Sequence, residues 1–266
     1  MLDPGRGRTK TGQLWAYARD DRPWGGTDPP GIIYIYAPDR KAERPIAHLA
    51  GLTGILQVDG YSGHRVMAER GDVNLAFCWA HVRRRFYELA AAGAAPIASE
   101  ALTRINVLYE IETPIRGRCP DERRAVRQDK SRIIVDELES WLRGKLQMIS
   151  QKTKLAEAIR YALSRWKGLT GFIDDGRIDI DSNVVERSIR PIALNRKNAL
   201  FAGSDGGGEH WAIIASLIET CKLCDVDPQF YLADVITKIA NNHPNSRIDE
   251  LLPWAYQTTQ DLKAVA

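Results

Sequence analysis

The sequence has few cysteines, little excess charge and no long hydrophobic run. Among 266 residues there are four cysteines, and only Cys221 and Cys224 have the C-x-x-C spacing. No second such pair completes a zinc site of the usual two-pair type. We interpret both as small apolar residues on one helix face, with metal or redox chemistry as the alternative. The scarcity favours a reduced, cytoplasmic protein.

The charge balance and the hydropathy of the chain exclude several further classes of protein. The chain has 37 Lys and Arg against 34 Asp and Glu, a net charge of +3, which excludes a histone-like polybasic protein and an acidic tail protein. No apolar run approaches the roughly 20 residues that span a bilayer, so no membrane partner is expected. With 44% hydrophobic and 27% charged residues, the chain is globular rather than disordered or fibrous. A chain of this length can bury about three quarters of the surface that it exposes when unfolded, without disulfide bonds or structural metal ions.

The first third of the chain is rich in strand signals. Four runs of β-branched and aromatic residues end at turn residues and predict strands. The first two predict a hairpin, with Trp15 and Tyr17 on one face of its first strand and Leu14, Ala16 and Ala18 on the other. The third run is short and apolar, which predicts burial on both faces. The four predicted strands are Gln13–Arg19, Gly31–Tyr36, Gly54–Val58 and Val73–Phe77.

Helical periodicity replaces these signals after Phe77. A helix is predicted over residues 79–92, and apolar residues continue at helical spacing from Ile134 to Trp166. One short helix is predicted earlier, over residues 41–50. Residues 116–132 carry seven basic residues against three acids and predict a polar connector. Strands followed by a long helical stretch indicate an α/β core with a helical insertion or tail.

Asp59 follows the third predicted strand, in the run Gln57–Gly63. The carboxyl end of a buried strand is where α/β sheets commonly place their sites. The alternative is structural, because Asp59-Gly60 is a common turn pair that ends strands.

Glu186 also has two interpretations. Asn183 and Glu186 are spaced like a capping box, in which the glutamate bonds back to the cap amide. Yet the segment from Arg187 to Lys197 contains four basic residues and no acid. A carboxylate beside such a stretch suits a metal-dependent phosphodiester site, with acids for cations and bases for phosphates.

Basic residues give a candidate DNA contact surface. Side chains of this kind contact phosphates without reading sequence, although a solvated helix face is the simpler interpretation. The glycine-rich run Gly203–Gly208 precedes a predicted helix but lacks the Gly-Lys-Ser/Thr of a nucleotide P-loop, which favours a flexible turn. The candidate DNA-binding residues are Arg83, Arg84, Arg85, Arg187, Arg190, Arg196 and Lys197.

Taken together, the motifs resemble the insertion sequence 66 family of bacterial transposases. The matching strings run in order over nearly the whole chain, which makes a chance match improbable. They are Leu2–Trp15, Asp20–Trp24, Leu56–Gly63, Cys78–Phe86, Asp181–Pro191, Arg196–Ser204, Ser216–Lys222 and Asp227–Leu232. The chain departs from the family at Cys224-Asp225, where members tend to have an Asn-Gly-like turn.

The resemblance implies an RNase H-like fold in which an Asp, Asp, Glu triad holds two Mg²⁺ or Mn²⁺ ions. Asp59 corresponds to the second Asp and Glu186 to the Glu, each as a catalytic residue and metal ligand. It also implies four parts. These are residues 1–92 (core strands two to five and first helices), 93–178 (helical insertion), 179–240 (remainder of the core with the Glu-bearing helix) and 241–266 (tail).

The family's first Asp lies on a strand just before the Leu2–Gly7 motif, and so would fall upstream of Met1. The expectation is an amino-terminally truncated DDE transposase, inactive alone, whose core lacks a central strand flanked by the strands of Trp15 and Val58. The expected partners are DNA ends and target DNA, further copies of the chain and accessory proteins of the element, on the bacterial nucleoid. The alternatives are a non-catalytic DNA-binding or interaction remnant and a different RNase H-like nuclease.

Overall fold

The chain folds into two compact units that both draw on distant parts of the sequence. The computed structural model describes residues 7, 9–69, 71–195, 197–199 and 201–256. Unit 1 takes its residues from Met1–Asp20, Thr27–Arg40 and Val184–Ala266, and unit 2 from Asp21–Gly26 and Lys41–Asn183. Both contain strands and helices, so the mixed α/β class is confirmed. The four-part domain division stays a prediction.

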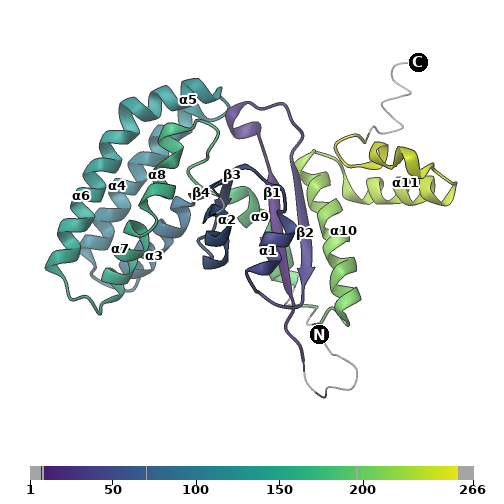
Figure 1. Ribbon diagram of the computed structural model, residues 1–266, viewed down its shortest axis with the longest axis horizontal. Coiled ribbons are helices and arrows are strands. Elements are labelled where there is room, and N and C mark those ends of the chain that lie inside the picture. The colour runs from purple at the N-terminus through teal and green to yellow at the C-terminus, as the bar shows by residue number, and fades with distance from the viewer. Residues whose placement is uncertain (1–6, 8, 70, 196, 200, 257–266) are drawn as a thin grey trace. The chain divides into compact units, whose positions relative to one another are not determined.

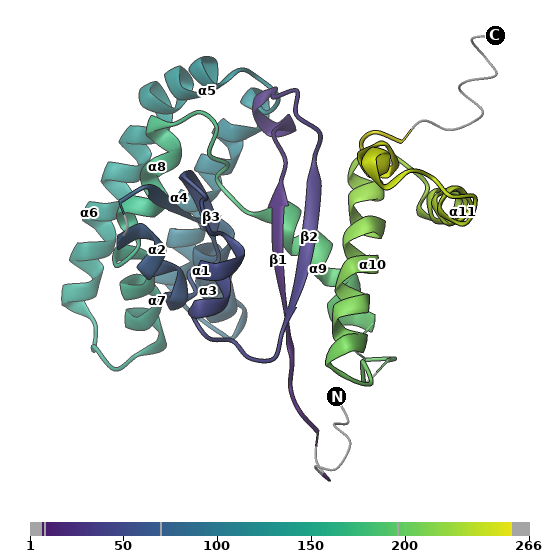
Figure 2. The same ribbon diagram turned by 45° about the vertical axis from the view of Figure 1, so that its right-hand side comes forward.

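Unit 1 is built on the predicted hairpin. Strands β1 (Gln13–Arg19) and β2 (Gly31–Ala37) pair antiparallel in full register. The Leu14, Ala16 and Ala18 face of β1 packs with β2 against helix α10 (Asp205–Leu223), which runs beside β2 in Figure 2. The predicted division of β1 into two faces is therefore confirmed, and the smaller side chains face the helix.

The rest of unit 1 is helical. Helix α9 (Asn183–Asn195) precedes α10, and α11 (Pro228–Ala240) and a 3-10 segment (Asn245–Leu251) follow it. Cys221 is fully buried beside Tyr231 in a small apolar cluster, while the Cys224 thiol contacts the Pro30 carbonyl. Both cysteines are free thiols. Cys221 has the apolar, structural role on the helix that the sequence favoured, whereas Cys224 follows the last residue of α10 and is half-buried.

Unit 2 contains a parallel pair of strands. Strand β3 (Gly54–Val58) pairs with β4 (Val73–Phe77), so that Val58 lies opposite Phe77 and both carboxyl ends meet at one edge. The predicted burial of β3 on both faces is wrong, because only Val58 is buried and the other residues are half-buried or exposed. Helices α1 (Glu43–His48) and α2 (Arg65–Glu69) flank β3 in the sequence.

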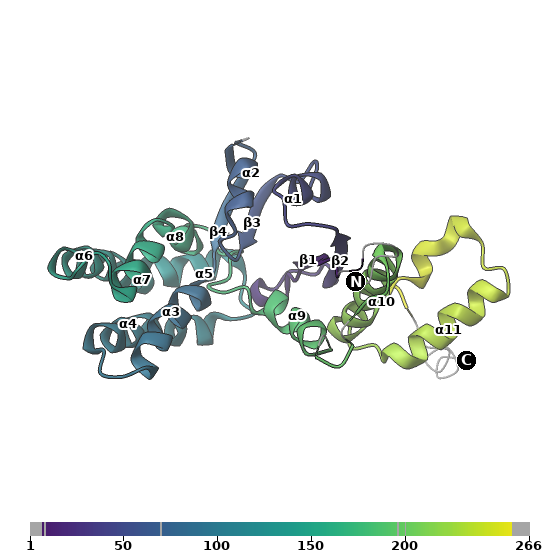
Figure 3. The ribbon, with the colours of Figure 1, turned by 90° about the horizontal axis from the view of Figure 1, so that it is seen from below.

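Five helices of unit 2 (α3, α4, α6, α7 and α8) enclose its main apolar core, and α5 lies outside this cluster. The fully buried Trp79, Phe86 and Ile159 belong to this core, and Figures 1 and 3 show α3 beside α4 and α6 beside α7. The amphipathic periodicity read from the sequence is thereby confirmed. The helices are α3 (Trp79–Ala91), α4 (Pro96–Glu112), α5 (Pro120–Val126), α6 (Arg132–Met148), α7 (Lys154–Leu163) and α8 (Trp166–Asp174).

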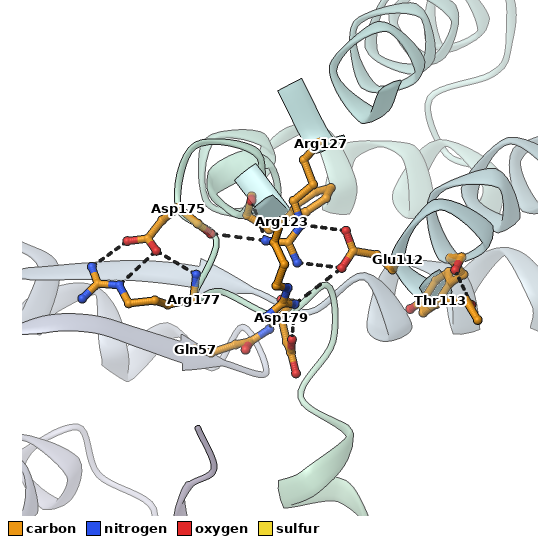
Figure 4. Close-up of polar contacts among 10 residues, drawn as sticks. Gln57, Glu112, Thr113, Arg123, Arg127, Asp175, Arg177 and Asp179 are labelled. Atoms are coloured by element: carbon orange, nitrogen blue, oxygen red, sulfur yellow. Dashed lines mark hydrogen bonds and ion pairs between the residues drawn. The ribbon is translucent and has the colours of Figure 1, made fainter. Parts of the chain in front are cut away.

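The basic stretch 116–132 is not the polar connector that its composition predicted. It forms α5 and a π-helical segment (Arg127–Ser131), and it buries Arg123 and Arg127 almost completely. Arg127 binds both carboxylate oxygens of Glu112, at 2.7 and 2.6 Å, and Arg123 donates to Asp179 at 2.6 Å. Figure 4 shows both arginines converging on Glu112. Composition missed this network because its acidic partners come from α4 and from the chain before α9.

Candidate functional site

Asp59 lies in a tight turn at the carboxyl end of β3. Its side chain is exposed, and Oδ1 accepts a hydrogen bond from the backbone N–H of Tyr61 at 2.9 Å. Gly60 has a φ of +90°, a conformation that glycine adopts without steric cost. The structural interpretation of Asp59-Gly60 as a strand-ending turn is therefore confirmed, and it leaves an exposed carboxylate in a fixed place.

Side chains from α7 and from the turn before α8, in the same unit, hold this turn. The Tyr161 hydroxyl donates to the Asp59 carbonyl and an Arg165 guanidinium N–H to the Gly60 carbonyl, both at 3.3 Å. A Cβ on Gly60 would lie only 2.9 Å from Nε of Arg165. Arg165 and Arg85 both stack on the Tyr161 ring, at 4.0 and 3.9 Å from its centroid. Tyr161 and Arg165 lie 102 and 105 residues along the chain from their partners Asp59 and Gly60, so no local sequence pattern marks them.

The segment that leads into α9 crosses the carboxyl ends of β3 and β4. Gln57 donates to the Asp179 carbonyl at 2.8 Å, and the Trp79 amide donates to the Ile180 carbonyl at 3.0 Å. The Ser182 amide donates to Sγ of Cys78 at 3.3 Å. Burial alone would raise the pKa of Cys78, but hydrogen bonds from His81 and Ser182 outweigh burial and lower it. The entry to α9 is thus fixed on the edge of the sheet that carries Asp59.

Glu186 is a half-buried residue in the first turns of α9, within unit 1. The predicted capping box is wrong in its register. It requires Asn183 to precede the helix and Glu186 to be the third helical residue, but α9 begins at Asn183 and Glu186 is its fourth residue. Asp181 accepts hydrogen bonds from the Asn183 backbone N–H and side-chain amide at 3.2 and 2.6 Å. An acidic side chain just before the helix therefore supplies the cap that Asn183 was predicted to supply.

The basic candidates have different surroundings. Arg83 and Arg84 are exposed and line a surface cavity of unit 2, whereas Arg85 stacks on Tyr161. Arg187, Arg190 and Lys197 are exposed in unit 1, and Arg196 lies outside the described residues. DNA binding by these seven residues stays a prediction.

The glycine-rich run is not the flexible turn that the sequence favoured. From Asp205 on it forms the first turn of α10, where Oγ of the cap residue Ser204 accepts a hydrogen bond from the Gly207 N–H at 3.1 Å. A Cβ on Gly208 would lie 2.7 Å from the Tyr36 ring. Glycine is needed here so that the helix can approach β2 closely.

Two carboxylates are the candidate metal ligands. Asp59 and Glu186 supply the carboxylate oxygens that Mg²⁺ prefers. Yet within the described part of the chain, no three His, Cys, Asp or Glu side chains are grouped so that they could hold a metal ion. The carboxylate oxygens therefore fit the expected Mg²⁺, but the described residues bring together too few ligands to hold it.

Comparison with known proteins decides the family. Residues 1–210 match the family described as "Transposase IS66 family", and residues 216–254 match the "IS66 C-terminal element". The chain belongs to the IS66 transposase family. The order of motifs noted in the sequence is thereby explained, from Leu56–Gly63 to Asp227–Leu232.

Curated relatives of this IS66 chain come from Sinorhizobium fredii. They are described as uncharacterized proteins y4qI and y4jD, 47% and 43% identical over 96% and 97% of the chain. The alignments cover 49% and 52% of those proteins, so the chain spans about half the length of the relatives it matches. No solved structure matches the chain. None of the helices in its described residues is both long and apolar enough to cross a membrane.

Proposed function

We propose that this chain is part of an insertion-sequence transposase that cleaves and joins DNA strands with the help of divalent cations. Membership of the IS66 family carries the proposal. The exposed carboxylate of Asp59 at the end of β3 supports it, since such strand ends commonly bear the reactive groups of α/β sheets.

In this proposal Asp59 and Glu186 are the metal ligands contributed by the chain. Bound Mg²⁺ or Mn²⁺ would activate water or a DNA 3′-hydroxyl and stabilise the leaving oxygen. The chain's own residues orient the ligand. The Tyr61 amide fixes Oδ1 of Asp59, and Tyr161 and Arg165 hold the backbone on either side of that turn.

The fold that we propose is RNase H-like with an incomplete core. An RNase H-like core has an antiparallel strand pair on one side of its first strand and a parallel pair on the other. In this chain β1–β2 is an antiparallel pair and β3–β4 is a parallel pair. We place the first strand, with the third carboxylate, outside the described residues. The chain of 266 residues is accordingly proposed to be inactive by itself, because two carboxylates do not fix two cations.

The test is strand cleavage by the purified chain on DNA carrying the ends of its element, with Mg²⁺ or Mn²⁺. We expect no cleavage from the chain alone. We expect cleavage when the chain follows the amino-terminal half of a Sinorhizobium relative, and its loss in Asp59→Asn and Glu186→Gln versions of that fusion. Robust cleavage by the chain alone would overturn the inactivity. An active fusion that tolerates both substitutions would overturn the assignment of the ligands and favour a different nuclease.

A non-catalytic DNA-binding remnant is the second candidate, favoured by the exposed Arg83, Arg84, Arg187 and Arg190. It predicts DNA binding that weakens steeply with salt, without cleavage in any fusion. In either case we propose that the chain acts on the bacterial nucleoid, as a homo-oligomer on DNA, with accessory proteins of the element.

A further inference from the structure

A surface cavity of unit 2 combines side chains that suit a nucleotide. It has a volume of about 460 Å³ and lies between α3, α4 and the entry to α9. Pockets for small organic ligands have volumes of about 300–1,000 Å³, so the cavity has room for more than an inorganic phosphate. It lies entirely within unit 2.

The cations on its wall come from one turn of α3. Arg83 and Arg84 are both exposed, and neither forms an ion pair within the described residues. Arg85, their neighbour in sequence, stacks instead on Tyr161 at 3.9 Å from the ring centroid. The cavity therefore gathers two of the three adjacent arginines, and both guanidinium groups are available for a phosphate.

Aromatic and amide groups complete the wall. Tyr87 is 56% exposed, which leaves a ring face open to a ligand. Burial and the nearby Asp181 carboxylate raise the pKa of Tyr109, so its hydroxyl stays a neutral donor. The side-chain amides of Asn106 and Asn183 donate to Glu110 and Asp181, at 2.7 and 2.6 Å, and their carbonyl oxygens remain as acceptors.

We propose that this cavity binds one unpaired nucleotide of a DNA strand. Arg83 and Arg84 bind its phosphate, the Tyr87 ring stacks on its base, and the amide oxygens of Asn106 and Asn183 face the edge of the base. The proposal rests on the proposed function, since it assumes that the chain acts on DNA. A paired base is excluded from such a cavity, because a base must leave the stack before it can lie on a protein ring inside a pocket.

The experiment compares two DNA hairpins of the same stem, each closed by a non-nucleotide linker, by fluorescence anisotropy with the full chain. One hairpin ends blunt and the other ends in two unpaired nucleotides. We expect tighter binding of the second hairpin. Tyr87→Ala should reduce this preference about fivefold or more, because one stacked base contributes that much to affinity. Tyr87→Phe keeps the ring and should keep the preference.

A matched pair of arginine variants tests the phosphate contact. Arg84→Ala should lower the slope of log affinity against log salt by about 1. Arg143→Ala removes the same charge from α6, where Arg143 is paired with Glu139, and should leave the slope unchanged.

The outcomes separate this proposal from the proposed function. Equal binding of the two hairpins, or a preference that survives in Tyr87→Ala, overturns the nucleotide site and leaves DNA transposition standing. Failure to bind either hairpin overturns both.

Discussion

Glu112 neutralises two arginines inside unit 2. It accepts two hydrogen bonds from Arg127, which has no exposed surface, and lies 3.6 Å from Arg123. Arg127 also donates to the Phe172 carbonyl at 2.9 Å, and the Asp179 carboxylate binds Arg123 at 2.6 Å. The network ties α4, α5 and α8 to the segment before α9, and Gln57 links that segment to β3.

Glu112→Gln should destabilise the protein by about 3–5 kcal/mol, because it leaves the buried guanidinium of Arg127 without its carboxylate. Urea unfolding followed by circular dichroism measures the loss. Glu139→Gln is the control, since the Glu139–Arg143 pair on α6 is solvent-exposed and should cost less than about 1 kcal/mol. Equal losses in the two variants would contradict the stabilising role of the network.

Cys221 makes the stability of unit 1 sensitive to high pH. Burial raises the pKa of this thiol from 9.0 to about 11. Between these values the unfolded chain releases the proton while the folded chain keeps it, so stability falls as pH rises from about 9 to about 11. Thermal unfolding across this range should show a shallower decline in Cys221→Ala. Cys119→Ala, at an exposed position, should decline as the wild type does.

At the scale of elements, the close approach of α10 to β2 organises unit 1. The Thr220 and Ser216 hydroxyls accept hydrogen bonds from the Ile32 and Tyr34 amides, at 3.1 and 2.8 Å. At the start of α10, Gly208 lies against the Tyr36 ring. Side chains of the helix thus bind backbone groups of the strand, and a residue without a side chain permits this contact.

Gly208→Ala should destabilise unit 1 by about 1–3 kcal/mol, because its Cβ would overlap the Tyr36 ring and force the helix away from the strand. Gly206→Ala, two residues earlier in the same helix, is the control. Its Cβ would approach only Oγ of Ser204, at 3.7 Å. It should be neutral or stabilise by up to about 1 kcal/mol through helix propensity. Differential scanning calorimetry of both variants distinguishes the two expectations.

At the scale of the whole molecule, a near-neutral chain carries exposed basic residues in both of its units. Arg187 and Arg190 lie on α9 in unit 1, whereas Arg83 and Arg84 lie on α3 in unit 2. The net charge of +3 therefore averages over local basic groups, and these groups rather than the total are expected to govern binding to DNA.

Replacing Arg187 and Arg190 together by alanine should lower the salt slope of duplex binding by about 2, because each phosphate contact contributes nearly one unit. Filter binding over a range of salt concentrations measures the slope. The double variant Arg104→Ala/Arg143→Ala removes equal charge from residues paired with Glu100 and Glu139. It should leave the slope unchanged, and an equal fall in both double variants would contradict specific contacts by α9.

Local patterns predicted the four strands and most helix positions, because alternation and helical spacing are written in consecutive residues. They also placed Asp59 at the end of β3. Local patterns failed where the interacting residues are distant in the sequence. Composition predicts Arg123 and Arg127 as part of a solvated connector, but both are buried because they pair with Asp179 and Glu112, which lie 56 and 15 residues away along the chain. The first turn of α10 was interpreted as flexible for the same reason, since its packing on Tyr36 is not local.

The sequence by itself determined the four strands, several of the helices, the IS66 membership and the two carboxylates that we propose as metal ligands, because each is encoded in short runs of residues. Only the tertiary structure decided which arginines are buried, which line a cavity and which residues hold the Asp59 turn. Burial and hydrogen bonding depend on groups brought together from distant parts of the chain, so Arg83 and Arg85, two positions apart, have different surroundings.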